Sequence, residues 1–275
     1  MALLEVPQPY DFELSTERFR AFGPDLANLW REGGLHRVVA GREVRIEAAR
    51  GGVDVEPLDA ATRPVVERLL GLPFDLDGFR RFAVTEPVLA ELEPRLRGFR
   101  PPLAPDPFES LVTSITAQQV SLFAAFAVRN RLIERYGTPA GNAYSFPARQ
   151  ALAGAREENL VALGFSRRKA EYVLALARSR LDLDGLAALP DEEVKPRLTA
   201  ERGLGEWTAD WFLARHLARP RAWPAGDLGL RKAAAAFYGK MDVRSLGSRF
   251  DPWQNLAAHY LLVGLRAGAP APAAR

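Results

Sequence analysis

The sequence has no cysteine, only three histidines and only four lysines among its 275 residues. Without cysteine the chain can form no disulfide, no iron–sulfur cluster, no thiolate zinc site and no cysteine nucleophile. The histidines, His36, His216 and His259, are scattered and lack the spacing of metal ligands. No apolar run is long enough to span a bilayer. We therefore expect no metal bound by side chains and no contact with a membrane.

Charge is unevenly distributed along the chain. Residues 1–106 hold 14 Lys and Arg against 18 Asp and Glu, whereas residues 107–275 hold 23 against 16. The carboxyl-terminal part is therefore the one suited to a polyanion such as nucleic acid. The first residues, MALLEVPQPYDFEL, contain no basic segment of the kind that begins a secretory signal. We expect a cytoplasmic protein, associated with the nucleoid if it binds DNA.

The pattern of apolar residues divides the chain into two regions. Residues 15–34 favour a helix that ends in glycines, and residues 43–49 alternate, with Val44, Ile46 and Ala48 on one face. Gly51-Gly52 then predicts a hairpin turn before a second strand over 53–57. From residue 106 onward the patterns are helical. The fold class is thus α+β: a small antiparallel sheet with helices, followed by an all-α region.

This division predicts the domain boundaries. We expect an amino-terminal α+β domain over 1–98 and a helical region over 99–275. Within the helical region, one subdomain spans about 110–220, and a second combines 221–275 with 99–109. Just before the first subdomain, Asp106 is the expected N-cap of a helix with Pro107 at its first position. Its apolar residues, Phe108, Leu111, Val112 and Ile115, recur at helical spacing and predict one buried face.

The stretch GLGEWTADW, residues 203–211, carries the most informative pattern. Glycines at 203 and 205 can adopt φ > 0 and leave the backbone amides open to an anion at the start of a helix. A phosphate fits such a turn, although an isolated G-x-G is more often an ordinary connection between helices. Asp227 follows Gly205 by 22 positions, in a loop that opens the next helix. Most aspartates there only cap, but the helix amides also favour the ionised carboxylate.

This arrangement resembles the helix–hairpin–helix DNA glycosylase superfamily. The segments PYDFEL, FESLVTSITAQQVS, LVALGFSRRKAEYVLALA, ERGLGEWTADW, AGDLGLRK and PWQNLAAHYLL follow in the order of its bacterial AlkA-type 3-methyladenine DNA glycosylase II branch. The resemblance covers nearly the whole chain. It implies an enzyme that binds double-stranded DNA, flips out an N-alkylated base and hydrolyses its glycosidic bond in base excision repair, without a cofactor. We expect it to act as a monomer.

The resemblance also implies roles for single residues. Asp227 would be the catalytic carboxylate. The hairpin would grip the DNA backbone, with a monovalent cation on its carbonyls near Gly203 and Gly205; its residues are Gly203, Leu204, Gly205, Glu206 and Thr208. Superfamily members that also cut the strand have a nucleophilic lysine two positions after the second hairpin glycine. This sequence has Trp207, which cannot form a Schiff base, so we expect no lyase activity.

Flipping requires a residue that fills the gap and walls that hold the base. Gln118 and Gln119 follow the helix expected over FESLVTSITA, and position 119 is a leucine wedge in well-known relatives. A pair of glutamines on a solvated helix is the alternative interpretation. We expect Trp207 and Trp211, at i and i+4, to line the pocket, with core packing as the alternative. The opposite wall would come from four aromatic residues of the first domain: Tyr10, Phe12, Phe19 and Phe22.

Leu262 aligns with a position on the last long helix where relatives have a pocket tryptophan. We therefore expect a wider or less aromatic pocket and a broad range of alkylated bases. Two other functions stay open at this point. One is a damaged-DNA-binding protein without catalysis, and the other is a glycosylase with lyase activity on oxidised bases.

Overall fold

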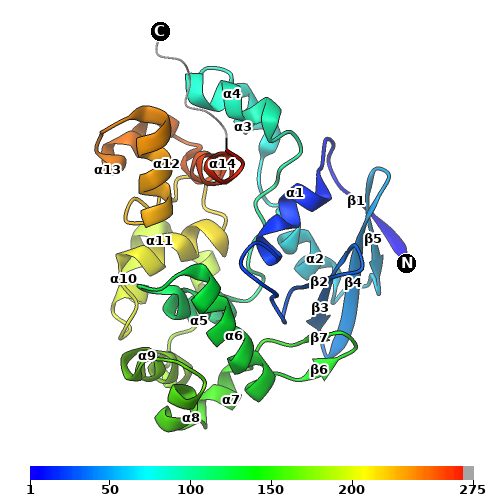
Figure 1. The fold of residues 1–275 in the computed structure, drawn as a ribbon, viewed down its shortest axis with the longest axis vertical. Coiled ribbons are helices and arrows are strands. Elements are labelled where there is room, and N and C mark those ends of the chain that lie inside the picture. The colour runs from blue at the N-terminus through cyan, green and yellow to red at the C-terminus, as the bar shows by residue number, and fades with distance from the viewer. Residues whose placement is uncertain (269–275) are drawn as a thin grey trace.

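The computed structural model describes residues 1–268 and confirms the α+β class. The amino-terminal part forms a five-stranded antiparallel sheet in the order β1-β5-β4-β3-β2, and the rest of the chain is mostly helical (Figure 1). The strands are β1 (Ala2–Glu5), β2 (Leu29–Arg31), β3 (Gly34–Val39), β4 (Arg42–Ala49) and β5 (Gly52–Glu56). Val44 and Ile46 are fully buried, whereas Ala48 at the end of β4 is exposed. Ile46 pairs with Leu35 on one side and with Val55 on the other.

The helix expected over 15–34 is wrong. The structure has α1 (Phe12–Thr16), a 3-10 turn η1 (Glu17–Phe19) and then β2. Gly23, with φ +96°, and Pro24 stop the helix, because the residue before a proline is disfavoured in helical conformation. Trp30 then pairs with Leu35 across the β2–β3 ladder. Tertiary pairing therefore overrides the local preference of residues 26–31.

Helices make up most of the chain after the sheet. Those before the glycine hairpin are α2 (Arg63–Leu69), α3 (Leu76–Ala83), α4 (Pro87–Arg95), α5 (Pro107–Ala117), α6 (Leu122–Tyr136), α7 (Arg149–Ala153), α8 (Glu157–Ala162), α9 (Arg167–Arg178), η2 (Gly185–Ala188) and α10 (Asp191–Thr199). After it come α11 (Glu206–Arg215), α12 (Leu228–Tyr238), α13 (Val243–Leu246), η3 (Gly247–Phe250) and α14 (Gln254–Arg266). Asp106 caps α5 as predicted, since its carboxylate accepts from the Glu109 amide at 2.6 Å.

The expectation that no strand follows residue 106 needs one correction. A two-residue pair, β6 (Pro139–Ala140) and β7 (Ala143–Tyr144), forms around a Gly141-Asn142 turn. Two residues are too few for an alternating pattern to be visible in the sequence. This β6–β7 pair contacts the amino-terminal domain, where the Tyr144 amide donates to the Leu26 carbonyl at 3.0 Å.

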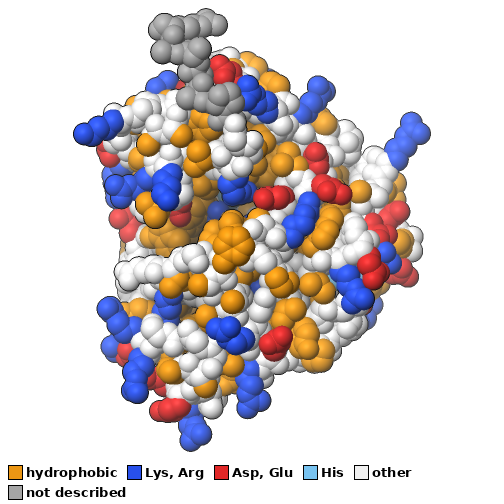
Figure 2. All heavy atoms as spheres, viewed as in Figure 1, with side chains coloured by type: hydrophobic (Ala, Val, Ile, Leu, Met, Phe, Trp, Pro, Cys, Tyr) orange, Lys and Arg blue, Asp and Glu red, His pale blue; other side chains and the backbone are white. Residues whose placement is uncertain are grey.

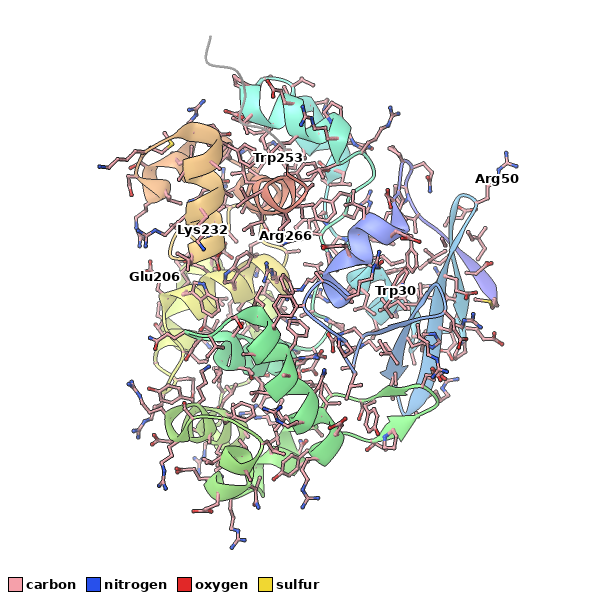
Figure 3. All side chains as sticks on the ribbon, in the orientation of Figure 1. Trp30, Arg50, Glu206, Lys232, Trp253 and Arg266 are labelled. Carbon is pink, nitrogen blue, oxygen red and sulfur yellow. The ribbon has the colours of Figure 1, made fainter. Side chains whose placement is uncertain are left out.

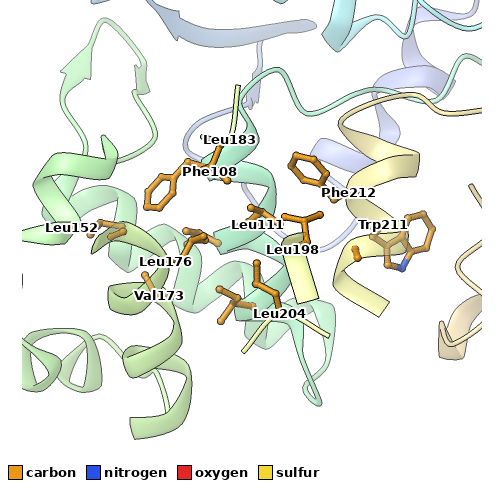
Figure 4. Close-up of a cluster of buried hydrophobic side chains, with 14 of the residues drawn as sticks. Phe108, Leu111, Leu152, Val173, Leu176, Leu183, Leu198, Leu204, Trp211 and Phe212 are labelled. Atoms are coloured by element: carbon orange, nitrogen blue, oxygen red, sulfur yellow. The ribbon is translucent and has the colours of Figure 1, made fainter. Parts of the chain in front are cut away.

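Three apolar clusters form the core. One lies in the amino-terminal domain; one joins α5, α9 and α11 and contains all four residues predicted for the buried face of α5 (Figure 4). The third packs residues 74–103 against residues 230–263. The predicted domain boundary at residue 98 stays a prediction. Helices α3 and α4 share this third core with α12 and α14, and this packing favours a boundary near residue 72. The end of the predicted second subdomain, 269–275, lies outside the described residues.

A ring of buried polar side chains joins the amino-terminal domain to α5 and α6. Arg129 of α6 bonds to Asp25 and to Glu109 of α5, the latter at 2.6 Å. Arg37 of β3 also reaches Glu109 at 2.6 Å and donates to Asn28 at 2.7 Å, and Asn28 closes the ring by donating to Asp25 at 2.9 Å. Burial alone would raise the pKa of Glu109, but Arg37 and Arg129 outweigh it and lower that pKa. The two guanidiniums of the ring therefore hold the buried Glu109 carboxylate in its charged form.

The buried histidines predict how stability depends on pH. Burial lowers the pKa of His216 to about 4, and its Nδ1–H donates to the Ala104 carbonyl at 2.8 Å. Between pH 6.5 and 4 the unfolded chain binds a proton that the folded chain does not, so stability falls as the pH falls through this window. We expect urea unfolding to give about 2 kcal/mol less stability from His216 at pH 5 than at pH 8. His216→Gln, which keeps an N–H donor, is expected to remove that part; an unchanged pH dependence would contradict the assignment.

Candidate active site

Asp227 is a carboxylate held by three hydrogen bonds on the wall of a large cavity. It is the N-cap of α12, as predicted, and its Oδ1 accepts from the Leu230 amide at 2.9 Å. Its Oδ2 accepts from the indole N–H of Trp207 at 3.1 Å and of Trp211 at 3.0 Å. Three N–H donors occupy both carboxylate oxygens and leave the group one orientation. A fixed negative charge of this kind can stabilise a developing positive charge nearby.

The two tryptophans hold Asp227 by their edges, which the sequence interpretation missed. Both lie on one face of α11, one turn apart, so both indole nitrogens reach the same oxygen. Trp207 is half-buried, whereas Trp211 is only 3% exposed and packs into the core of the first helical subdomain. The guanidinium of Arg215 covers the face of Trp211, with Cζ 3.6 Å from the ring centroid. The i, i+4 spacing of the two tryptophans was visible in the sequence, but it was interpreted only as a surface for stacking on the base.

The central cavity measures about 1100 Å³ and lies between residues 14–22, α5, α6, α11, α12 and α14. Its wall contains five of the residues predicted for the base pocket: Phe19, Phe22, Trp207, Trp211 and Leu262. Tyr10 and Phe12 do not line it; Phe12 packs instead on Trp30, with ring centroids 5.5 Å apart. Figure 2 shows a hollow on this face, between the C-terminal helices above and α5 and α6 below, with apolar side chains inside it.

Charged residues from three helices surround this region. Lys232 of α12 and Arg266 of α14 line the cavity, and Glu206 begins α11 beside it (Figure 3). Glu206 is exposed and pairs with Arg244 at 3.0 Å. Arg266 pairs with Glu17 at 3.1 Å. The predicted contact of Glu206 with DNA stays a prediction, and this ion pair would have to open or turn for it.

The glycine hairpin has φ > 0 at Gly203, as expected, but not at Gly205, where φ is −99°. Gly203 has φ +88°, and a Cβ there would lie 2.1 Å from Cγ of Tyr172, so no other residue fits without moving that ring. Gly205 is the N-cap of α11. Leu204 and Thr208 are buried, and their backbone amides already donate to the carbonyls of Glu201 and Gly205 at 3.1 and 3.0 Å. The Gly203 carbonyl accepts from the side chain of Gln118 at 2.9 Å; a cation on the hairpin carbonyls stays a prediction.

A second hollow, of about 520 Å³, lies over the hairpin. Gln118, Gln119 and the hairpin residues line it together with Arg168 and Lys169 at the start of α9. These two basic side chains were not predicted as binding residues. The signal that could have found them is the run SRRK, which places cations directly after the Ser166 cap of α9.

Gln119 lies at the edge shared by the two hollows. It is exposed and has φ +54°, an uncommon conformation for a residue other than glycine. Apolar side chains follow it at the surface: Val120, Leu122 and Phe123 are 47%, 42% and 63% exposed. Phe123 contacts Phe22 edge-on, with centroids 5.8 Å apart. The lip of the cavity is therefore apolar, and the role of Gln119 as a wedge stays a prediction.

Within residues 1–268, no three His, Cys, Asp or Glu side chains come together as metal ligands would. Nor does any helix in this part of the chain have the length and apolar character needed to cross a membrane.

Comparison with known proteins agrees with this geometry. Residues 112–244 match the model of the HhH-GPD superfamily base excision DNA repair proteins. A DNA-3-methyladenine glycosylase of Bacillus subtilis is 26% identical over 226 residues, 76% of this chain and 75% of that protein. The structure of a 3-methyladenine DNA-glycosylase from Archaeoglobus fulgidus superposes with a TM-score of 0.88 and 27% identity, covering 97% of this chain and 99% of that one.

A third relative was solved with DNA. The 3-methyladenine DNA glycosylase Mag1 of Schizosaccharomyces pombe, in complex with abasic DNA, has a TM-score of 0.58 and 25% identity, covering 67% of this chain and 94% of that one. Fold, hairpin and cavity together define a DNA glycosylase of the helix–hairpin–helix class. The chain belongs to the HhH-GPD superfamily of base excision DNA repair proteins.

Proposed function

We propose that this protein excises N-alkylated bases of the 3-methyladenine type from double-stranded DNA by hydrolysis alone. The observation that carries the proposal is the Asp227 carboxylate, fixed by three N–H donors on the wall of a cavity large enough for an extruded base. The named activities of the Bacillus and Archaeoglobus relatives support the choice of lesion.

The chemistry needs few groups because an N-alkylated purine already carries positive charge. When its bond to C1′ breaks, the electron pair goes to the base and positive charge develops on the sugar. Asp227 stabilises that charge and orients the water that attacks C1′. The products are the free base and an abasic site. Trp207 and Leu262 on the cavity wall favour a flat, apolar ligand.

We propose that the DNA backbone lies along the hairpin. The backbone amides of Gly203 and Gly205 and the basic side chains Arg168 and Lys169 suit phosphates, which position a duplex without reading its sequence. Gln119 and the apolar residues after it would then face the duplex at the flipped nucleotide.

The proposal that the enzyme has no lyase activity rests on Trp207, which stands where lyase members have the nucleophilic lysine. Lys232, the one lysine among residues 1–268 that lines the cavity, is exposed on α12. Strand cleavage would require it to reach C1′.

The proposal is tested with duplexes that each carry one lesion: 3-methyladenine, 7-methylguanine or 8-oxoguanine. We expect release of the methylated bases, with strand breaks only after alkali, and no covalent adduct on borohydride treatment. Binding without base release would favour a damage-binding protein. An adduct that Lys232→Met removes would instead establish lyase activity.

A further inference from the structure

Arg215 places a positive charge without a counter-ion inside the central cavity. Its guanidinium lies over the face of Trp211, at 3.6 Å, and the side chain lines the cavity. Its Nε is buried without a hydrogen-bond partner, and among residues 1–268 the side chain has no ion pair. Burying an unpaired guanidinium costs free energy because the charged group loses its hydration. An arginine remains protonated in proteins, so loss of the proton does not relieve that cost.

Arg18 adds a second cation from the opposite side. It belongs to η1, lines the same cavity, and has no side-chain hydrogen bond or ion pair within the described part of the chain. Burial lowers the pKa of Arg18 to about 10, which still leaves it charged at neutral pH. Two elements far apart in sequence therefore bring unpaired guanidiniums to one space.

Neighbouring groups do not cancel this charge. Glu17 pairs with Arg266, and Asp227 is bonded to Trp207, Trp211 and the start of α12. Asp25 and Glu109 also line the cavity and act on Arg18, but they are paired with the arginines of the buried ring. His259 packs edge-on against Trp211. Burial, and then the charges of Arg215, Arg18 and Arg266, lower the pKa of His259 far below its usual value. The cavity is thus positive around Arg215 and Arg18 and negative at Asp227.

We propose that Arg215, supported by Arg18, faces the flipped base and stabilises the negative charge that moves onto it, so that it determines excision of neutral lesions. The inference rests on the proposed glycosylase function and extends it. When the glycosidic bond breaks, its electron pair passes to the base nitrogen and positive charge develops at C1′ beside Asp227. The base then takes a proton from the attacking water, and the hydroxide that remains bonds to C1′ and gives the abasic sugar. Hypoxanthine is a base of the required kind, because it is neutral when bound and leaves with developing negative charge.

The effect of Arg215 differs between neutral and cationic bases. A neutral base becomes partly anionic in the transition state, so the arginine stabilises the transition state but not the bound substrate. A cationic base is repelled in the bound state and becomes nearly neutral in the transition state. Only interactions stronger in the transition state than in free enzyme and substrate raise kcat/KM. Arg215 should therefore raise kcat/KM for neutral lesions, and raise KM and kcat together for cationic ones.

The test compares Arg215→Met with the wild type on two duplexes, one with hypoxanthine and one with 7-methylguanine, in single-turnover reactions over a range of enzyme concentrations. We expect kcat/KM for hypoxanthine to fall about 100-fold. For 7-methylguanine we expect kcat/KM to stay within about threefold while KM and kcat both fall. Arg215→Lys should restore part of the hypoxanthine activity, because it keeps the charge.

Arg20→Met provides the matched control. Arg20 also lies over a tryptophan, with Cζ 4.0 Å from the centroid of Trp30, but it does not line the cavity. It should change neither reaction. Equal losses on both lesions in Arg215→Met would show that the arginine only supports Trp211, and would overturn the inference. So would a wild type that excises 7-methylguanine but not hypoxanthine. Failure on both lesions by the wild type would contradict the proposed function itself.

Discussion

Replacing Asp227 by asparagine is expected to lower base excision about 1000-fold while the protein still binds lesion-containing DNA. Asparagine has the shape of aspartate but no charge, so the positive charge that develops at C1′ loses its partner. The amide also fits the local hydrogen bonds poorly. Either its NH₂ faces the indole N–H groups of Trp207 and Trp211, or it faces the Leu230 amide, because all three are donors. The measurement is the single-turnover rate of release of 3-methyladenine from a duplex.

Asp75→Asn separates catalysis from capping. Asp75 is the N-cap of α3 and accepts from the Gly78 amide at 2.9 Å, the same cap geometry as in Asp227, but it lies outside the cavity wall. Its substitution should leave the rate unchanged. Because one lost hydrogen bond costs about 1–3 kcal/mol, the thermal midpoint of both variants should be recorded. A rate within tenfold of the wild type for Asp227→Asn would remove Asp227 from the reaction.

Local sequence signals were enough to predict Asp227 as a cap but not its partners. An aspartate after a Pro/Gly loop predicts a helix start from adjacent residues alone. The two indole donors come from another helix, so their convergence depends on how α11 packs beside α12. The same holds for Arg215 and Arg18, which lie about 200 residues apart in the sequence. No pattern within a single element indicates that two unpaired cations share one cavity.

Helices were predicted best where caps and apolar spacing agree. Asp106, Pro107 and the apolar face of α5 all lie within residues 106–115, and the structure confirms each of them. The error at residues 26–31 has the opposite cause. Trp30 and its neighbours form a strand because β3 offers a partner, and that partner is set by long-range register. The domain to which α3 and α4 belong could not be predicted locally either, because their apolar faces pack against helices from the far end of the chain.

Glu109→Gln is expected to reduce the free energy of unfolding by about 3–5 kcal/mol. Glu109 is 4% exposed and accepts from Arg37 and Arg129, both at 2.6 Å, while Arg129 also pairs with Asp25. With a neutral amide at 109, two buried guanidiniums share one carboxylate, and one charge stays buried without compensation. Urea unfolding at pH 7 measures the change. High salt should alter it little, because buried pairs are screened much less than exposed ones.

Glu193→Gln is the matched control, because it removes an exposed i, i+4 pair with Arg197 at 3.0 Å. Such pairs contribute about 0.3–0.5 kcal/mol. The double variant Glu109→Gln/Arg37→Met leaves one cation, Arg129, and one anion, Asp25, in the ring. If the loss in Glu109→Gln comes from an unbalanced charge, the double variant should be more stable than the single one. If it comes from disturbed packing, the second substitution should add to the loss. A single variant within 1 kcal/mol of the wild type would show that the ring orients the two domains without stabilising them.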